Sequence, residues 1–201
     1  MLVDRLHAVS VVVGANFRFG HRAVGTVDTL AELGKSLGFE VVAVGLVGEA
    51  EVRWSSTYVR QCVAEGDTEA AMAVLGRPHR VEGVVVHGDH RGRELGYPTA
   101  NLHVSRHAAV PADGIYAGWL IRPSGERLPA AISIGTNPTF DGSERRVEAY
   151  CLDRTGLDLY GERVALDFGP RLRATLKFDG VDALLEQMSA DVARARALTA
   201  G

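Results

Sequence analysis

Six short strand-like segments between residues 81 and 178 constrain the fold of this chain more than any other feature of its sequence. The segments are residues 81–87, 115–121, 130–134, 146–152, 163–168 and 173–178. Turn residues, such as Pro123-Ser124-Gly125 and Asp141-Gly142-Ser143, separate several of them. Six short strands with frequent turns favour a closed antiparallel barrel over an open sheet.

A helix is predicted to follow the last of these strands. Between Gly180 and Leu198, apolar side chains recur at positions i, i+3, i+4, i+7 and i+11, namely Val181, Leu184, Leu185, Met188 and Val192. A stripe with this spacing is typical of a helix that packs one face on a core. We therefore expect the C-terminal helix to lie against the barrel.

The first part of the chain has a different pattern. Residues 9–13 and 39–44 are strand-like, and residues 26–37, 56–64 and 68–75 have helical spacing. Strands that alternate with helices indicate an α/β domain, in which helices cover a parallel sheet. With a junction near residues 76–80, we expect two domains, 1–77 and 78–201.

Composition excludes several classes of function. The 201 residues are 46% hydrophobic and 23% charged, with a net charge of −3, so electrostatics gives no reason to expect nucleic-acid binding. No run of 18 apolar residues indicates a membrane span, and the N-terminus lacks the features of a signal peptide. The two cysteines lack metal-ligand spacing and are expected to be reduced thiols in a cytoplasmic protein. Exposed strand edges in the first part give only weak support for self-association.

The segment GDHRGRELGYPTAN, from Gly88 to Asn101, is the strongest functional signal. Glycines allow backbone amides to approach phosphate oxygens, and arginines neutralise phosphate charge. If the chain is extended after Pro98, Thr99 and Asn101 project to the same side. They would then offer two neutral oxygen ligands to Mg²⁺ that carries nucleotide phosphates. On composition alone, an ordinary surface turn that leads into a strand is an equal alternative.

From about Leu75 to the C-terminus, the chain resembles the riboflavin kinase module of the bacterial bifunctional riboflavin kinase/FAD synthetases. The matching segments are LGRPHRVEGVVVHGDHRGRELGYPTANL, DGIYAGWL, ISIGTNPTF, VEAYCLD, DLYGERVALDF and LRATLKFD, in the order and spacing of the family. The resemblance implies a six-stranded Greek-key barrel with a C-terminal helix. It also implies an ATP-dependent kinase that uses Mg²⁺ and phosphorylates riboflavin to FMN.

The resemblance also implies roles for individual residues. Glu148, in VEAYCL, matches the catalytic base that accepts the proton of the ribityl hydroxyl. Residues implied to contact ATP are Gly88, Arg93, Thr99 and Tyr160, and those implied to bind the metal are Thr99 and Asn101. Arg173 matches an arginine on the flavin side. The family commonly has a glutamate where this chain has Thr175, and this difference predicts a weaker hydrogen bond or ion pair to Arg173.

Two segments of the first domain, VVVGANFRFG and WSSTYVR, resemble the later part of the FMN adenylyltransferase module. Ser55, Ser56, Thr57 and Arg60 match a motif that helps to hold a triphosphate at a helix N-terminus. No segment matches the glycine-rich HxGH-type motif, and Asn16 replaces the usual acidic residue. We therefore expect an N-terminally truncated remnant of a Rossmann-like nucleotidylyltransferase domain, without adenylyl transfer.

Two other functions stay open at this point. The chain could be a bifunctional FAD synthetase that also adenylylates FMN, or a flavin-binding or regulatory protein that has lost catalysis. Thr175 and the incomplete first domain favour the second alternative. FAD formation from FMN and ATP would identify the first, and flavin binding without turnover would identify the second.

Overall fold

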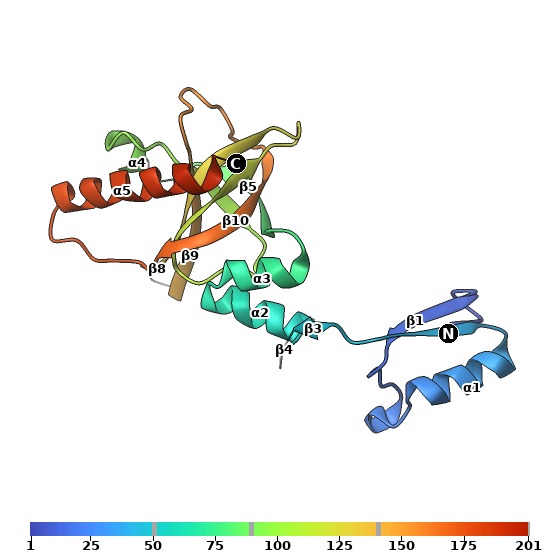
Figure 1. Ribbon diagram of the computed structural model, residues 1–201. Coiled ribbons are helices and arrows are strands. Elements are labelled where there is room, and N and C mark those ends of the chain that lie inside the picture. Colours follow the sequence, from blue (N-terminus) through green and yellow to red (C-terminus); the bar gives the residue numbers. More distant parts are fainter. Residues whose placement is uncertain (50–51, 89–90, 140–141, 201) are drawn as a thin grey trace. The chain divides into compact units, whose positions relative to one another are not determined.

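The computed structural model describes residues 1–49, 52–88, 91–139 and 142–200, which form two compact units, Met1–Ser55 and Ser56–Gly201 (Figure 1). In the first unit, strands β1 (Ser10–Gly14) and β2 (Glu40–Val44) pair in parallel. The 3-10 helix η1 (His21–Ala23) and helix α1 (Val27–Leu37) connect them, and β3 (Gly48–Glu49) pairs antiparallel with β4 (Val52–Arg53). The strands and the helix predicted here are confirmed.

Local sequence explains both ends of α1. Thr26 caps the N-terminus, because its hydroxyl accepts a hydrogen bond from the Thr29 amide at 3.3 Å. Gly38 ends the helix in the left-handed conformation, with a φ of 81° that a side chain would disfavour. The helix therefore begins and ends within about a residue of the predicted 26–37 segment.

The second unit is built on a closed six-stranded antiparallel barrel with the strand order β10-β5-β6-β9-β8-β7. Its strands are β5 (His79–Val86), β6 (Ala100–Val104), β7 (Gly114–Ile121), β8 (Arg127–Thr139), β9 (Gly142–Cys151) and β10 (Arg163–Arg173). Strands β7, β8 and β9 follow one another, and β10 returns beside β7, which is the Greek-key arrangement. Tyr116, Leu120, Ile132, Leu166 and Phe168 are among the fully buried core side chains. The predicted barrel is confirmed.

The strand prediction needs two corrections. Residues 100–104 form β6, which was not among the six predicted strands. The predicted strand 173–178 is wrong beyond its first residue, since β10 ends at Arg173 and residues 174–178 have no regular structure. Leu176 in this segment is about half exposed. Register shifts on either side of Arg171 show that β10 is bulged where it pairs with β7. The bulge joins the predicted 163–168 strand to the start of the predicted 173–178 strand.

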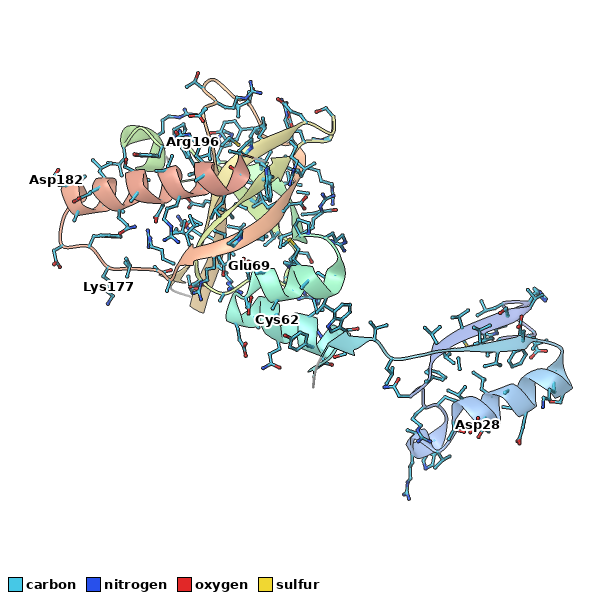
Figure 2. The ribbon with its side chains drawn as sticks, in the orientation of Figure 1. Asp28, Cys62, Glu69, Lys177, Asp182 and Arg196 are labelled. Carbon is cyan, nitrogen blue, oxygen red and sulfur yellow. The ribbon has the colours of Figure 1, made fainter. Side chains whose placement is uncertain are left out.

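The C-terminal helix α5 (Val181–Thr199) confirms the predicted helix and contacts β7, β8 and β10. Figure 2 places Asp182 at the start of α5, Arg196 near its end, and Lys177 in the connection before it. Ala195 is buried against Ala117, Leu152 and Leu172 on the barrel. Among the described residues, no helix is long and apolar enough to cross a membrane.

Helices α2 (Ser56–Glu65) and α3 (Thr68–Leu75) belong to the barrel unit. The buried Thr68 hydroxyl donates a hydrogen bond to the Gly169 carbonyl of β10 at 2.5 Å. The Ala112 amide donates to the Val63 carbonyl at 3.2 Å. The domain boundary expected at residue 77 therefore lies inside the second compact unit, because these two helices pack on the barrel that follows them.

Replacing Thr68 with valine is expected to lower the free energy of unfolding by about 1–3 kcal/mol, the cost of leaving the buried Gly169 carbonyl without its donor. Urea denaturation followed by circular dichroism measures the change. Thr175→Val, at an exposed position, is the matched control and should have little effect. Equal stability of the two variants would show that this hydrogen bond does not stabilise the packing of α3 on the barrel.

Candidate functional site

The site is based on a row of side chains that crosses three strands of the barrel. Asn101 of β6 lies opposite Glu148 of β9, and Glu148 lies opposite Ser133 of β8. Directly opposite residues of antiparallel strands project to the same face. The alternate residues Val147 and Ile134 are buried in the core, so the row faces outward. Strand register therefore brings together Asn101 and Glu148, two of the predicted site residues.

Thr99 completes this group of polar side chains. It follows Pro98 just before β6, and its hydroxyl donates a hydrogen bond to Glu148 Oε2 at 3.2 Å. Asn101 Nδ2 donates to the Thr99 carbonyl at 3.4 Å. All three side chains are half-buried. The Thr99–Glu148 hydrogen bond links the predicted metal pair to the predicted base.

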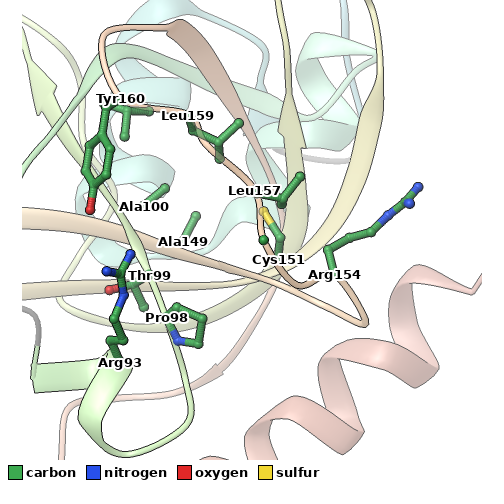
Figure 3. Close-up of a pocket in the computed structure, with 12 residues that line it drawn as sticks. Arg93, Pro98, Thr99, Ala100, Ala149, Cys151, Arg154, Leu157, Leu159 and Tyr160 are labelled. Carbon is green, nitrogen blue, oxygen red and sulfur yellow. The ribbon is translucent and has the colours of Figure 1, made fainter.

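A cavity of about 410 Å³ opens on one side of Thr99. Its wall is mostly apolar, with Val85, Ala100, Ala149, Cys151, Leu157 and Leu159 among the lining residues. Burial raises the pKa of the Cys151 thiol to about 11, so this thiol is neutral and part of the apolar wall. Figure 3 shows Arg93, Thr99 and Tyr160 together on one side of this cavity, whereas the side chain of Arg154 points away from these three residues.

Three of the four residues predicted to contact ATP line this cavity. Arg93 and Thr99 line it, and Tyr160 lines it while stacking on His87, with ring centroids 3.9 Å apart. Gly88 does not line the cavity but lies against Asn101. A side-chain carbon at Gly88 would come within 2.4–2.6 Å of the Asn101 carboxamide atoms. The absence of a side chain at residue 88 therefore permits the observed position of Asn101.

Replacing Gly88 with alanine is expected to displace the Asn101 side chain, because the added methyl carbon would overlap the carboxamide. For the kinase reaction that the family resemblance implies, we expect the rate of phosphoryl transfer to fall by about 10- to 100-fold, the effect of moving a positioned group by about an ångström. A coupled ADP-release assay with riboflavin and MgATP measures it. Gly180→Ala, where nothing lies within 4 Å of the added carbon, should keep the parental rate. A Gly88→Ala variant as active as Gly180→Ala would contradict this role.

A second pocket, of about 200 Å³, lies on the other side of Thr99 between the outer face of the barrel and α5. Tyr97 and Tyr150, which contact each other edge to face at a centroid distance of 5.3 Å, line it. Its apolar lining includes Ile115, Ala131, Leu184, Met188 and Val192, and its polar lining includes Thr99, Ser133, Glu148, Arg173 and Asp191. The pocket therefore suits a flat apolar ring with a hydroxyl-bearing chain that reaches Glu148.

Arg173 lines this second pocket and forms an ion pair that was not predicted from the sequence. Its Nη2 lies 2.7 Å from Asp191 Oδ2, and Gln187 Nε2 donates to Asp191 Oδ1 at 3.0 Å. The only sequence signal was an acidic residue within the apolar pattern of a predicted helix. Thr175 is exposed in the segment after β10, so the carboxylate partner of Arg173 comes from α5 instead.

The residues of the triphosphate motif lie elsewhere. Ser56, Thr57 and Arg60 occupy the first turns of α2, and Ser55 directly precedes this helix. None of the four lines either pocket described above. Their proposed contact with a triphosphate stays a prediction.

Two family models match the chain: riboflavin kinase over residues 75–199 and FAD synthetase over residues 1–58. The bifunctional riboflavin kinase/FMN adenylyltransferase of Escherichia coli K12 is 35% identical over 98% of this chain and 62% of its own length. The Pseudomonas fluorescens protein of the same name is 39% identical over 100% of this chain and 64% of its own length. The chain therefore spans a little under two thirds of these relatives.

A solved structure resembles nearly the whole chain. The crystal structure described as a macrolide-efflux protein from Streptococcus pneumoniae is 37% identical, with a TM-score of 0.85 over 95% of this chain and 61% of that one. The riboflavin kinase match covers more than half of the chain and contains the barrel, both pockets and the Thr99–Glu148 pair. The chain thus belongs to the riboflavin kinase family.

Proposed function

We propose that this chain transfers the γ-phosphoryl group of ATP to the 5′-hydroxyl of riboflavin to give FMN. The observation that carries the proposal is the Thr99–Glu148 hydrogen bond at the junction of two pockets with different linings. A phosphotransferase with two substrates needs donor and acceptor sites that meet at the reacting atoms. We assign the larger cavity to ATP and the smaller pocket to riboflavin.

In the donor site, the apolar wall would hold the adenine ring and Tyr160 would lie beside the nucleotide. Arg93 supplies positive charge near Thr99, where the phosphates would enter (Figure 3). Thr99 lines this site and offers a hydroxyl, whereas Asn101 does not line it but lies beside Thr99, to whose carbonyl its amide donates, and offers a carboxamide oxygen. These two oxygens would fit Mg²⁺, because this ion takes oxygen ligands, mostly from substrate phosphates and water and only a few from the protein. When bound, Mg²⁺ would neutralise charge on the transferring phosphoryl group.

In the acceptor site, Glu148 would orient the 5′-hydroxyl and accept its proton. A new bond forms between the 5′ oxygen and the γ-phosphorus, and the bond from that phosphorus to the bridging oxygen of ADP breaks. The position of Glu148 on a strand paired on both sides suits a base that must stay in place. The Thr99 hydroxyl would hold the carboxylate toward the junction of the two pockets.

The test is FMN formation from riboflavin and MgATP, followed by chromatography of the flavins. FMN and ADP in equal amounts are expected. Flavin binding without turnover would reject the proposal and favour a regulatory protein. We also propose a cytoplasmic site of action, which the buried, unpaired cysteines Cys62 and Cys151 and the need for ATP support.

A second candidate activity is adenylyl transfer to FMN, which the match of residues 1–58 to FAD synthetase favours. Our expectation is that this chain lacks it, because the glycine-rich HxGH-type motif is not found in its sequence. Incubation with FMN and MgATP distinguishes the two, since adenylyl transfer would produce FAD and pyrophosphate. Formation of FAD would contradict the expectation and leave the kinase proposal unaffected.

A further inference from the structure

We propose that Asp191 is a positioning residue: it directs the Arg173 guanidinium, which the family resemblance already places on the flavin side, toward a carbonyl oxygen on the pyrimidine edge of the flavin ring. This inference rests on the proposed function, because it takes riboflavin as the occupant of the second pocket. The Arg173–Asp191 pair would determine which flavins bind tightly. This role is separate from the phosphoryl transfer at Glu148.

Strand register sets the separation between the two ends of the pocket. Glu148 of β9 lies opposite Ser133 of β8, Ser133 opposite Ile115 of β7, and Ile115 opposite Arg173 of β10. Glu148 and Arg173 are therefore three strand spacings apart, about 14 Å along the barrel surface. This span is comparable to riboflavin from its 5′-hydroxyl to the far edge of its ring. A flavin with its hydroxyl at Glu148 would bring its ring edge to Arg173.

The lining between these two ends is suited to the ring. Ile115 and Ala131 lie on the barrel side, and Leu184, Met188 and Val192 lie on the helix side, so both faces of a flat ring would meet apolar groups. Apart from the hydroxyls of Tyr97 and Tyr150, the polar groups that line this pocket are Thr99, Ser133 and Glu148 and the Arg173–Asp191 pair. Since the pyrimidine edge is the polar edge of the flavin ring, it is the edge expected at the ion pair.

The ion pair fixes the direction of the guanidinium. Arg173 Nε lies 2.9 Å from Asp191 Oδ2, Nη2 lies 2.7 Å from the same oxygen, and Nη1 donates to the Ala174 carbonyl at 3.0 Å. The Arg173 and Asp191 side chains are only 16% and 5% exposed. Each terminal nitrogen carries a second hydrogen, so the guanidinium retains donors for a ligand carbonyl.

Hydrogen bonds hold the Asp191 carboxylate in place and occupy most of its capacity to accept. Its carboxylate accepts hydrogen bonds from Arg173 and from Gln187, one helical turn earlier. It therefore acts on the flavin through Arg173 and not by direct contact. Without the carboxylate, the guanidinium would lose both its charge partner and its orientation. The affinity for flavins would then fall, and so would the preference for a strong acceptor at the ring edge.

The test compares riboflavin with 2-thioriboflavin and 4-thioriboflavin, in which sulfur, a weaker hydrogen-bond acceptor, replaces one ring carbonyl oxygen. Binding to the full chain is measured by isothermal titration calorimetry. The parent should bind riboflavin at least about tenfold more tightly than one of the two analogues, as for a hydrogen bond from a charged donor. In Asp191→Asn this ratio should fall to near one, and Asp191→Glu should partly restore it.

A second ion pair of the same helix provides the matched control. Arg196 of α5 binds Asp153 at 2.6 Å outside the pocket, so Asp153→Asn also removes an ion pair from α5. This variant should keep the parental ratio. The inference is overturned if Asp191→Asn keeps the ratio, if Asp153→Asn loses it equally, or if the parent binds all three flavins alike. A ratio of affinities does not depend on the fraction of protein that is folded.

Failure of this inference and failure of the proposed function give different results. A parent that forms FMN but shows no preference among the three flavins overturns only the role of the ion pair. A parent that shows the preference, and loses it in Asp191→Asn, but forms no FMN supports the ion-pair role and rejects the kinase. A parent that binds no flavin overturns both.

Discussion

Replacing Glu148 with glutamine is expected to reduce the rate of FMN formation by about 10²- to 10⁴-fold, the usual contribution of a positioned general base. Glutamine has nearly the same size and can still accept a hydrogen bond from Thr99, so the strand pairing and both pockets should be preserved. It cannot take up the proton of the 5′-hydroxyl. The loss should therefore appear in kcat, with little change in the KM for riboflavin or ATP.

The control for this variant is Glu82→Gln, which removes an exposed carboxylate from β5 of the same barrel. It should keep the parental kcat, and both variants should unfold at the parental urea concentration. Riboflavin binding by Glu148→Gln, measured by calorimetry, should also stay near the parental value. Parental turnover in Glu148→Gln would show that another group accepts the proton, and the assignment of the base would be wrong.

The barrel could be predicted from sequence because its signals are local. Turn residues and short apolar segments mark individual strands, and their number favours closure. Two features depend on tertiary structure instead. The bulge near Arg171 lets β10 continue past Gly169 and Pro170, which interrupt a regular strand pattern. Helices α2 and α3 were correctly predicted as helices, but nothing in a local pattern states which sheet a helix will cover.

The grouping of the candidate side chains was predictable to a similar extent and for similar reasons, whereas their roles stay predictions. Thr99 and Asn101 lie two residues apart in the sequence, and the family resemblance pointed to Glu148. The pairing of β6 with β9 then places Glu148 beside Asn101. Asp191 could not be found in this way. It lies 18 residues from Arg173, and its role arises only when α5 packs across β10. A single aspartate within an apolar helical pattern does not reveal its partner.

Replacing Asn101 with alanine is expected to lower the rate of FMN formation at fixed Mg²⁺ by about 10²-fold or more, because a lost metal contact removes several kcal/mol of transition-state stabilisation. The change removes one of the two proposed oxygen ligands and leaves Thr99 bonded to Glu148. Part of the loss should be recovered as Mg²⁺ is raised, since the remaining groups would bind the ion more weakly. A titration of initial rate against Mg²⁺ at constant ATP measures both effects.

Two further variants distinguish a metal ligand from a strand residue. Asn101→Asp keeps an oxygen at the same place, so it should need less Mg²⁺ than Asn101→Ala, although its charge lies opposite Glu148 in register. His103→Ala changes an exposed side chain two residues further along the same face of β6 and should follow the parental Mg²⁺ curve. If Asn101→Ala also followed the parental curve while losing activity, Asn101 would hold the loop at Gly88 and not the ion. The Mg²⁺ dependence therefore decides between the two roles, whereas the rate at a single Mg²⁺ concentration does not.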